Sequence, residues 1–499
     1  MGQLSMGWLL LLSGNGVAIA AAALIPRSEF VLRTWVVAMT AILSLGGYLL
    51  MRHRENPISA ELTTSLGVMA QFLVPPLYFV SVRLSGFVGE ITNPYLSYMP
   101  DAVVAALLGQ TLFLMGYKVS TGRSTVRAIG GHETAPGDYL ATMAPLLLLV
   151  WLSRVVLLKA GSYYHTVRTP FMSESQYHSV LSIFSGWGIF PVAGAWAMRF
   201  AAPTGTQRRA WTPVCLLLTA AEVLWFAPTG SREPLYFPFA AAVFAFLAMR
   251  RRWPTNTLAL LLVAGFVSLP VIALFRNVMM TYVAPSELSP SLIQQAAVKS
   301  GSILRGSSFI WEDHITSAFG RLGDVRSTAV IIKGVPDTVP FLRGETYAKI
   351  VYLFLPRFVY PAKPLMILPI NRWFFKNDRS SSPTTLTGEA YLNFGWAGLF
   401  LVLPVVGAIT SRFERFLFRR RAFSVRAAVV VGMAPILARL PVENAVTWVT
   451  QMFYVTFVAL FLDLWESAVA RNRCLSEERL APVDPRNPGP RALVSRGGR

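Results

Sequence analysis

Long apolar runs recur along almost the whole chain, and they constrain the fold more than any other feature. Each is close to the ~20 residues that a helix needs to cross a hydrocarbon core. Lipid leaves backbone polar groups no partner outside the protein, so only helices or closed barrels span a membrane, and runs of this length exclude a barrel. The sequence therefore predicts an all-α polytopic membrane protein with about 12 transmembrane helices. The predicted spans are 7–25, 35–51, 63–82, 102–117, 139–158, 179–198, 211–228, 235–249, 256–275, 391–410, 425–439 and 447–465.

The composition agrees with this class. Of the 499 residues 54% are hydrophobic and 14% are charged, whereas soluble domains carry roughly a quarter of charged residues. Cys215 and Cys474 provide no disulfide framework, and the five histidines lack the spacing of metal ligands. We therefore expect neither a metal site nor a cofactor.

The distribution of Lys and Arg predicts the orientation. Among the short connections between predicted spans, the even-numbered ones hold most of the Lys and Arg, including the basic runs 250–252 and 419–421. Because such loops stay inside, both termini are predicted to be cytoplasmic, and the one long connection is predicted to lie outside. The net charge of +20 is explained by this bias and by a basic tail near anionic headgroups, so we expect no nucleic-acid partner.

The spans divide the chain into four regions. These are nine transmembrane helices in 1–275, a large external loop in 276–390, three further helices in 391–468, and a disordered basic tail in 469–499. The loop is too apolar for disorder, and the patterns at 290–304 and 317–334 predict short amphipathic helices. The apolar stretch 349–369 is broken by three prolines, so we expect it to lie at the membrane interface.

One charged turn separates two predicted spans, in the stretch 226–237, FAPTGSREPLYF. Ser231 can cap the helix that follows, and Arg232 adds a bidentate donor to the free N–H groups of its first turn. Such a helix start suits a phosphate group. The alternative is an interfacial anchor in which Arg232 pairs locally with Glu233.

A second polar stretch leads into the tenth predicted span. Thr387 is predicted to cap that helix, which would leave Glu389 and Asn393 one turn apart on the same face. Gly395 and Gly398 would allow another helix to approach closely. The alternative is that Glu389 only stabilises the helix N-terminus electrostatically, through the positive end of the helix dipole. The loop motif WEDH at 311–314 offers acid–base groups, although such groups in a polar loop are more often solvated.

Three charged residues in or near predicted spans should face the protein interior, because charge is costly in lipid. They are Arg33, Arg154 and Glu222. We expect Arg154 and Glu222 to pair.

Three motifs in this order resemble those of the bacterial Wzy-type polymerases of O-antigen and exopolysaccharide repeat units. They are GSREPL, LPRFVYPAKP at 355–364 and TGEAYLNFGWAGLF at 387–400. The resemblance implies a metal-independent, GT-C-like glycosyltransferase of the bacterial inner membrane. Its substrates would be undecaprenyl-diphosphate-linked oligosaccharides, and a chain-length regulator is a possible partner beside the membrane lipids. The paired R-x10-G loop repeats of some polymerases are absent here.

The resemblance also implies residue roles. Arg232, Arg357 and Glu389 would be catalytic. The substrate-binding residues would be Lys363, Asn393, Arg276, Arg321, Arg326 and Arg343.

Two other functional classes fit parts of the pattern. An O-antigen ligase uses the same donor and usually has a functional loop histidine, for which His314 is the candidate in this loop. A lipid-linked oligosaccharide flippase would be a transporter, although the sequence lacks a convincing internal repeat. A scaffold of a polysaccharide-synthesis complex is a third alternative.

Overall fold

The computed structural model describes most of the chain, and the part it describes is helical, without β-strands. The described residues are 2–52, 59–82, 93–121, 135–159, 176–227, 232–250, 274, 278, 290–305, 325–353, 360, 370–375, 384–418 and 423–480. Their helices are α1 (Gly2–Leu24), η1 (Arg27–Glu29), α2 (Phe30–Arg52), α3 (Ala60–Val68), η2 (Met69–Leu73), α4 (Val74–Val82), η4 (Asn93–Tyr98), α5 (Met99–Thr121), α6 (Pro136–Lys159), α8 (Gln176–Gly186), α9 (Ile189–Ala201), α10 (Gly205–Phe226), α11 (Arg232–Arg250), α13 (Pro290–Arg305), α15 (Val325–Gly334), α16 (Glu345–Leu353), α17 (Ile370–Phe375), α18 (Leu386–Phe394), α19 (Trp396–Phe418), α20 (Phe423–Arg439), η5 (Leu440–Val442) and α21 (Ala445–Leu480).

Within the described ranges, seven helices are long and apolar enough to cross a membrane. They cover Met6–Leu24, Arg27–Arg52, Met99–Ser120, Pro136–Lys159, Leu181–Ala201, Trp396–Leu417 and Ala445–Val469. The chain is thus a helical membrane protein with several spans, as its apolar runs predict. The runs 63–82, 211–228, 235–249 and 425–439 also form helices but are not among the seven. The run 256–275 lies outside the described residues apart from Leu274.

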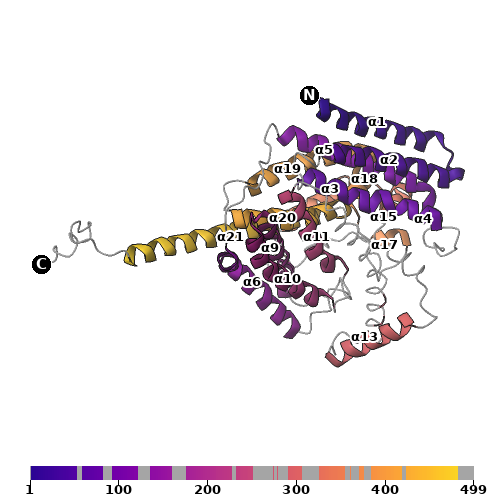
Figure 1. Cartoon of the computed structure of the whole chain (residues 1–499). Helices are drawn as coiled ribbons and strands as arrows, with labels where there is room; N and C mark the ends of the chain where they lie inside the picture. Colours follow the sequence, from indigo (N-terminus) through magenta and orange to yellow (C-terminus); the bar gives the residue numbers. More distant parts are fainter. Residues whose placement is uncertain are drawn as a thin grey trace.

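The helices form two groups that share a central layer. α1, α2, α4, α5 and α19 pack on one side, whereas α9 packs against α10, α11 and α20 on the other. α3 contacts both α5 and α20, and α20 also contacts α21, so these helices join the groups (Figure 1). A buried face on each helix is what a bundle in lipid requires, because only the outermost faces meet acyl chains.

The helices α5 and α19 pack closely against each other. A Cβ added at Gly116 would lie 1.9 Å from the Pro404 carbonyl oxygen, and one at Gly407 would lie 2.0 Å from the Phe113 carbonyl oxygen. The two backbones therefore touch where each helix has a glycine, as in other membrane helix pairs.

The third predicted span contains a π-helical segment, η2, between α3 and α4. Pro75 and Pro76 begin α4, and each ring clashes with the carbonyl four residues before it. The backbone widens, and the Val74 N–H donates to the Met69 carbonyl oxygen five residues earlier. Within η2, Gln71 Nε2 donates to the Ala438 carbonyl oxygen of α20 at 3.3 Å.

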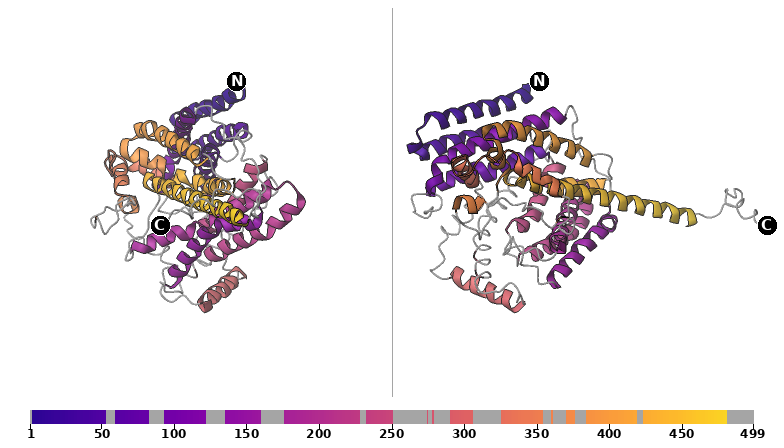
Figure 2. Two further views of the ribbon diagram at one scale, coloured as in Figure 1. Left: turned by 90° about the vertical axis from the view of Figure 1, so that its left-hand side faces the viewer. Right: turned by 180° about the vertical axis from the view of Figure 1, so that it is seen from behind.

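The helices of the long loop differ in how they are placed. The predicted helix at 290–304 is α13, which lies apart from the bundle (Figure 2). The predicted helix at 317–334 is confirmed over its described part, α15. This helix is buried against α5, η4 and α18, because residues of both its faces, including Thr328 and Val330, are covered.

Two predicted boundaries near the C-terminus need correction. The tenth span does not begin at 391, because Gly395 has a φ of 61° and separates α18 from α19. The segment 386–394 is a short helix of its own. Residues 469–480 are not disordered but continue α21 (Figure 2), since they contain neither Gly nor Pro and are rich in Ala, Arg, Glu and Leu. Residues 481–499 lie outside the described residues.

Candidate functional site

The helix α18 carries the motif TGEAYLNF, and its start is fixed by threonines. Thr385 caps the helix, since its Oγ1 accepts from the Gly388 N–H at 2.9 Å. Thr387, the predicted cap, lies inside the helix instead. The Oγ1 atoms of Thr385 and Thr328 are 2.9 Å apart, so a hydrogen bond joins α18 to the loop helix α15. The cap lies two residues earlier than predicted because Thr385 alone has non-helical backbone angles (φ 59°, ψ 150°).

Asn393 ties α18 to the segment that leads into α16. Its Oδ1 accepts from the Gly344 N–H at 2.8 Å, and its Nδ2 donates to Thr346 Oγ1 at 2.8 Å and to the Glu389 carbonyl oxygen at 2.8 Å. Its own carbonyl oxygen accepts from the Arg343 N–H at 3.1 Å. The side chain of Asn393 is fully buried, so these bonds are shielded from water and hold the turn in one geometry.

Arg343 has a left-handed backbone with φ 48°, followed by Gly344 with φ 92°. A non-glycine residue adopts this conformation only where its surroundings hold it, and here Asn393 does so by accepting from the N–H groups of both Arg343 and Gly344. The Arg343 side chain is exposed. The structure thus presents a predicted substrate-binding arginine on a fixed turn.

Glu389 lies on the same face of α18 as Asn393, as predicted, but it points into the protein. Its Oε2 accepts from the Ala445 N–H at the start of α21 at 2.6 Å, and Thr346 provides a side-chain hydrogen bond. Burial raises the pKa of the Glu389 carboxyl group above its usual value. The carboxylate holds α16 and α21 against α18. Because only 1% of the residue is exposed, the carboxylate is not accessible to a substrate.

The other predicted site residues are only partly described. Arg232 is the first residue of α11, in agreement with the expected helix start. Arg326 is half-buried on α15. The remaining candidates and the motif WEDH lie outside the described residues: Arg276, Arg321, Arg357, Lys363 and His314.

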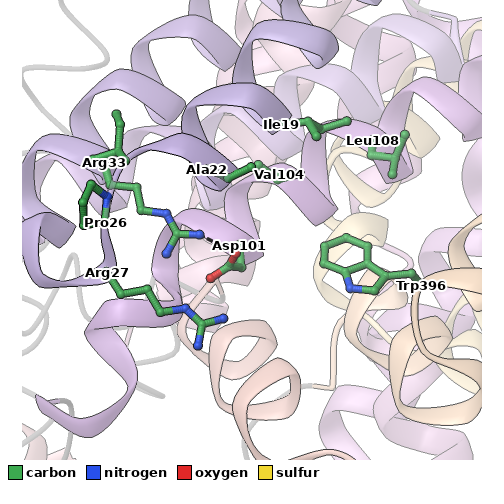
Figure 3. A pocket seen from close by; sticks show the side chains of 11 residues that line it. Ile19, Ala22, Pro26, Arg27, Arg33, Asp101, Val104, Leu108 and Trp396 are labelled. Carbon is green, nitrogen blue, oxygen red and sulfur yellow. Dashed lines mark hydrogen bonds and ion pairs between the residues drawn. The ribbon is translucent and has the colours of Figure 1, made fainter.

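A cavity of about 500 Å³ lies on another side of α18, and sequence reasoning missed it. It lies where α1 ends and where α2, α5 and α19 begin (Figure 3). Arg27, Arg33 and Asp101 provide its polar lining, and Trp396 stands across from them. The ring of Trp396 packs edge-on against Tyr391 of α18, with centroids 5.5 Å apart. The cavity and the motif helix are therefore neighbours.

Comparison of the chain with protein-family models, curated proteins and solved structures found no match.

A second buried charge pair lies between α6 and α10. Arg154 donates to Glu222 Oε2 at 2.6 Å and to the Ser185 carbonyl oxygen at 2.8 Å. The guanidinium also stacks over the rings of Trp151 and Trp225, at 4.8 and 5.1 Å from their centroids. The predicted pairing is confirmed, and its complete enclosure makes it a structural contact between helices.

The arrangement around α18 provides two features that could bind an anionic ligand. It holds an exposed arginine on a fixed turn, and it places a cationic cavity with apolar walls one side chain away. Over the described ranges no group of three or more His, Cys, Asp or Glu side chains gathers in a way that could hold a metal ion. The side-chain cations near α18 in these ranges include Arg27, Arg33 and Arg343.

Proposed function

We propose that this chain polymerises undecaprenyl-diphosphate-linked oligosaccharide repeat units at the outer face of a bacterial inner membrane. The glycan would leave one lipid diphosphate, and its anomeric carbon would bond to a hydroxyl oxygen of the next lipid-linked unit. The electron pair of the broken bond passes to the diphosphate, and the proton of the hydroxyl passes to a carboxylate or imidazole that acts as general base. Such a reaction needs positioned cations for the leaving group and a rigid surface for two substrates.

The observation that supports this proposal most is the enclosure of α18. Loop helices α15 and α16 and the start of α21 all pack against it, and Thr385, Glu389 and Asn393 each provide a hydrogen bond for one of these contacts. Where a long loop folds onto the ends of transmembrane helices, protein rather than lipid surrounds the site that forms at that face of the membrane. In this proposal, the motif that resembles the polymerases forms the centre of that face.

The structure suggests how to divide the implied roles. Glu389 and Asn393 act as positioning residues, because their polar atoms are occupied by α16 and α21. Arg343 is the described loop arginine best placed to contact a diphosphate. The other implied cations, which we retain in the proposal, are Arg232, Arg276, Arg321, Arg326, Arg357 and Lys363.

The proposed topology has about twelve spans. The five beyond the seven long apolar helices are α3 to α4, α10, α11, α20 and the run 256–275. With both termini cytoplasmic, α18 and the cavity lie at the outer face. A chain-length regulator would be a partner of this face.

The lipid-linked glycans of a deletion strain test the proposed activity. We expect single repeat units to accumulate on the outer side and to be extended again when the gene is restored. Long undelivered chains would instead identify a ligase, and repeat units retained on the cytoplasmic side would identify a flippase. Either of these results would end the polymerase proposal.

Arginine replacements test the site. Arg343→Ala should reduce chain extension by about a hundredfold, the usual effect of removing one donor that stabilises transition-state charge. Arg343→Lys should recover little, since an ammonium cannot bind a phosphate in two places. Arg232→Ala and Arg232→Lys should behave alike. Arg209→Ala, an exposed change in the first turn of α10, is the matched control and should extend chains normally at equal membrane levels. Normal extension in the Arg343 variants would remove this residue from the site.

A further inference from the structure

The cavity beside Trp396 has a cationic end and an apolar end. Arg27 and Arg33 lie at the first, whereas Ile19, Val104 and Leu108 line the second (Figure 3). This division is that of an amphiphile, with a charged group at one end and hydrocarbon at the other. The volume of about 500 Å³ is that of a typical small-molecule site.

The cationic end is prepared for a ligand. Arg33 NH2 lies 2.9 Å from Asp101 Oδ1, and Arg33 NH1 reaches the Ser97 carbonyl oxygen at 3.5 Å. Arg33 Nε and Asp101 Oδ2 are both buried and have no hydrogen-bond partner. Buried groups of this kind are costly unless satisfied. A ligand that both accepts and donates hydrogen bonds would satisfy them.

Arg27 completes the cationic end from the exposed side. Its NH1 donates to the Tyr98 hydroxyl at 3.1 Å, and its guanidinium lies 4.5 Å from the centroid of the same ring. Tyr98 thus holds the guanidinium from one side, and Figure 3 shows Arg27 and Asp101 close together at this end of the cavity. Two positive side chains against one carboxylate leave one net positive charge in the cavity.

The apolar end is open towards the membrane. Ile19 of α1 is 45% exposed and Trp396 of α19 is 39% exposed, and both belong to helices apolar enough to span. In a bilayer these side chains contact acyl chains. A lipid tail can therefore lie between α1 and α19 while its headgroup occupies the cationic end.

We propose that this cavity binds one membrane phospholipid whose headgroup joins a phosphodiester to a hydrogen-bond donor, as in phosphatidylethanolamine. The phosphodiester contacts Arg27 and Arg33, and the ammonium group donates to Asp101 Oδ2. The negative charge of the phosphodiester lies against the two guanidinium groups, and the positive charge of the ammonium lies against Asp101. The diphosphate group of a lipid diphosphate has no cationic donor to offer to Asp101 Oδ2. The site is thus distinct from that of the proposed glycan substrates and does not depend on the proposed function.

Lipid titration of the purified full-length chain, followed by native mass spectrometry, tests the proposal. Phosphatidylethanolamine should bind about tenfold or more tightly than phosphatidylcholine, which has the same net charge but no N–H donor, because hydrogen bonds to charged groups are strong. Diacylglycerol, which lacks the phosphate, and inorganic phosphate, which lacks the tails, should bind weakly. Equal binding of all three lipids would overturn the proposal, as would stronger binding of inorganic phosphate.

Variants assign the effect to the cavity. Arg27→Gln should weaken both phospholipids by about tenfold, and Arg27 is exposed, so its loss leaves the core intact. Asp101→Asn should reduce the preference for ethanolamine over choline. Ala22→Phe should block binding by filling the cavity without touching a charge. Arg209→Gln is the charge-matched control and should bind as wild type.

Unchanged binding in Arg27→Gln and Ala22→Phe would show that the lipid lies elsewhere and would end the proposal. Because binding is measured on the purified chain, this result is independent of whether glycans are polymerised.

Discussion

Asn393→Ala should release the turn that carries Arg343. The replacement removes three side-chain hydrogen bonds, each of 2.8 Å. At about 1 kcal/mol each, their loss costs roughly 3 kcal/mol. Thr346 is left buried without its Asn393 donor. A nine-residue helix such as α16 is marginal by itself, so it should detach from α18 locally while the spans remain folded.

Limited trypsin digestion of the detergent-purified chain measures this release. Asn393 binds the N–H of the Arg343–Gly344 peptide and the N–H of the peptide before it, so this turn must open before it is cleaved. If opening is fast relative to cleavage, ~3 kcal/mol corresponds to about a hundredfold faster cutting after Arg343. Cleavage after Lys349, which lies in α16, should accelerate in parallel.

Tyr391→Phe is the control, because it alters the same helix and touches none of the three hydrogen bonds. It should be cleaved at the wild-type rate. Thr346→Val removes one of the three bonds together with the hydrogen bond from Thr346 to Glu389, and it should accelerate cleavage by less than Asn393→Ala does. If Asn393→Ala is cleaved after Arg343 at a rate within about threefold of wild type, the turn is held by something other than Asn393, and the reasoning fails.

Three further changes test other contacts. Glu389→Gln should flatten the pH dependence of stability. Burial raises the folded pKa of Glu389, so its contribution to stability is present below the unfolded pKa and is lost as pH rises through the folded pKa. Parallel stability profiles of wild type and variant in unfolding titrations from pH 4 to 9 would contradict this. Gly407→Leu should separate α5 from α19, because the leucine side chain would overlap the Phe113 backbone. A cysteine crosslink between the two helices should then no longer form. A stable variant that still forms the crosslink would refute this packing. Arg154→Met should destabilise the folded chain by about 3–5 kcal/mol, because it leaves Glu222 buried without its partner. Adding Glu222→Leu should restore part of this stability. Additive losses of stability in thermal unfolding of the single and double variants would rule out the pairing.

The sequence predicted the helical membrane class because lipid permits few backbone solutions. It also predicted that Glu389 and Asn393 share a face, since a spacing of four residues follows from helix geometry alone. It could not predict the break at Gly395, because glycine is also common inside membrane helices. The cap at Thr385 was missed for a related reason: Thr385 and Thr387 are equivalent in composition, and only the backbone angles distinguish them.

The cavity shows a different limit of sequence reasoning. Arg33 was expected to face the interior, but its partner Asp101 is 68 positions away, and no local pattern connects the two. Such pairs are set by which helices pack together. The inward-pointing Glu389 carboxylate is similar, since its acceptor role depends on the start of α21, 56 positions later.

The continuity of α21 has a mechanical consequence. It runs as one helix of 36 residues, which at about 1.5 Å per residue makes a rod of about 54 Å. Its first backbone N–H is bound by Glu389, and its far end projects beyond the bundle (Figure 2). A rod transmits rotation without bending, so a tilt of about 10° around its midpoint would displace each end by about 5 Å. Such a displacement of the start of the rod would break the hydrogen bond between Glu389 and the Ala445 N–H, so this bond resists the tilt.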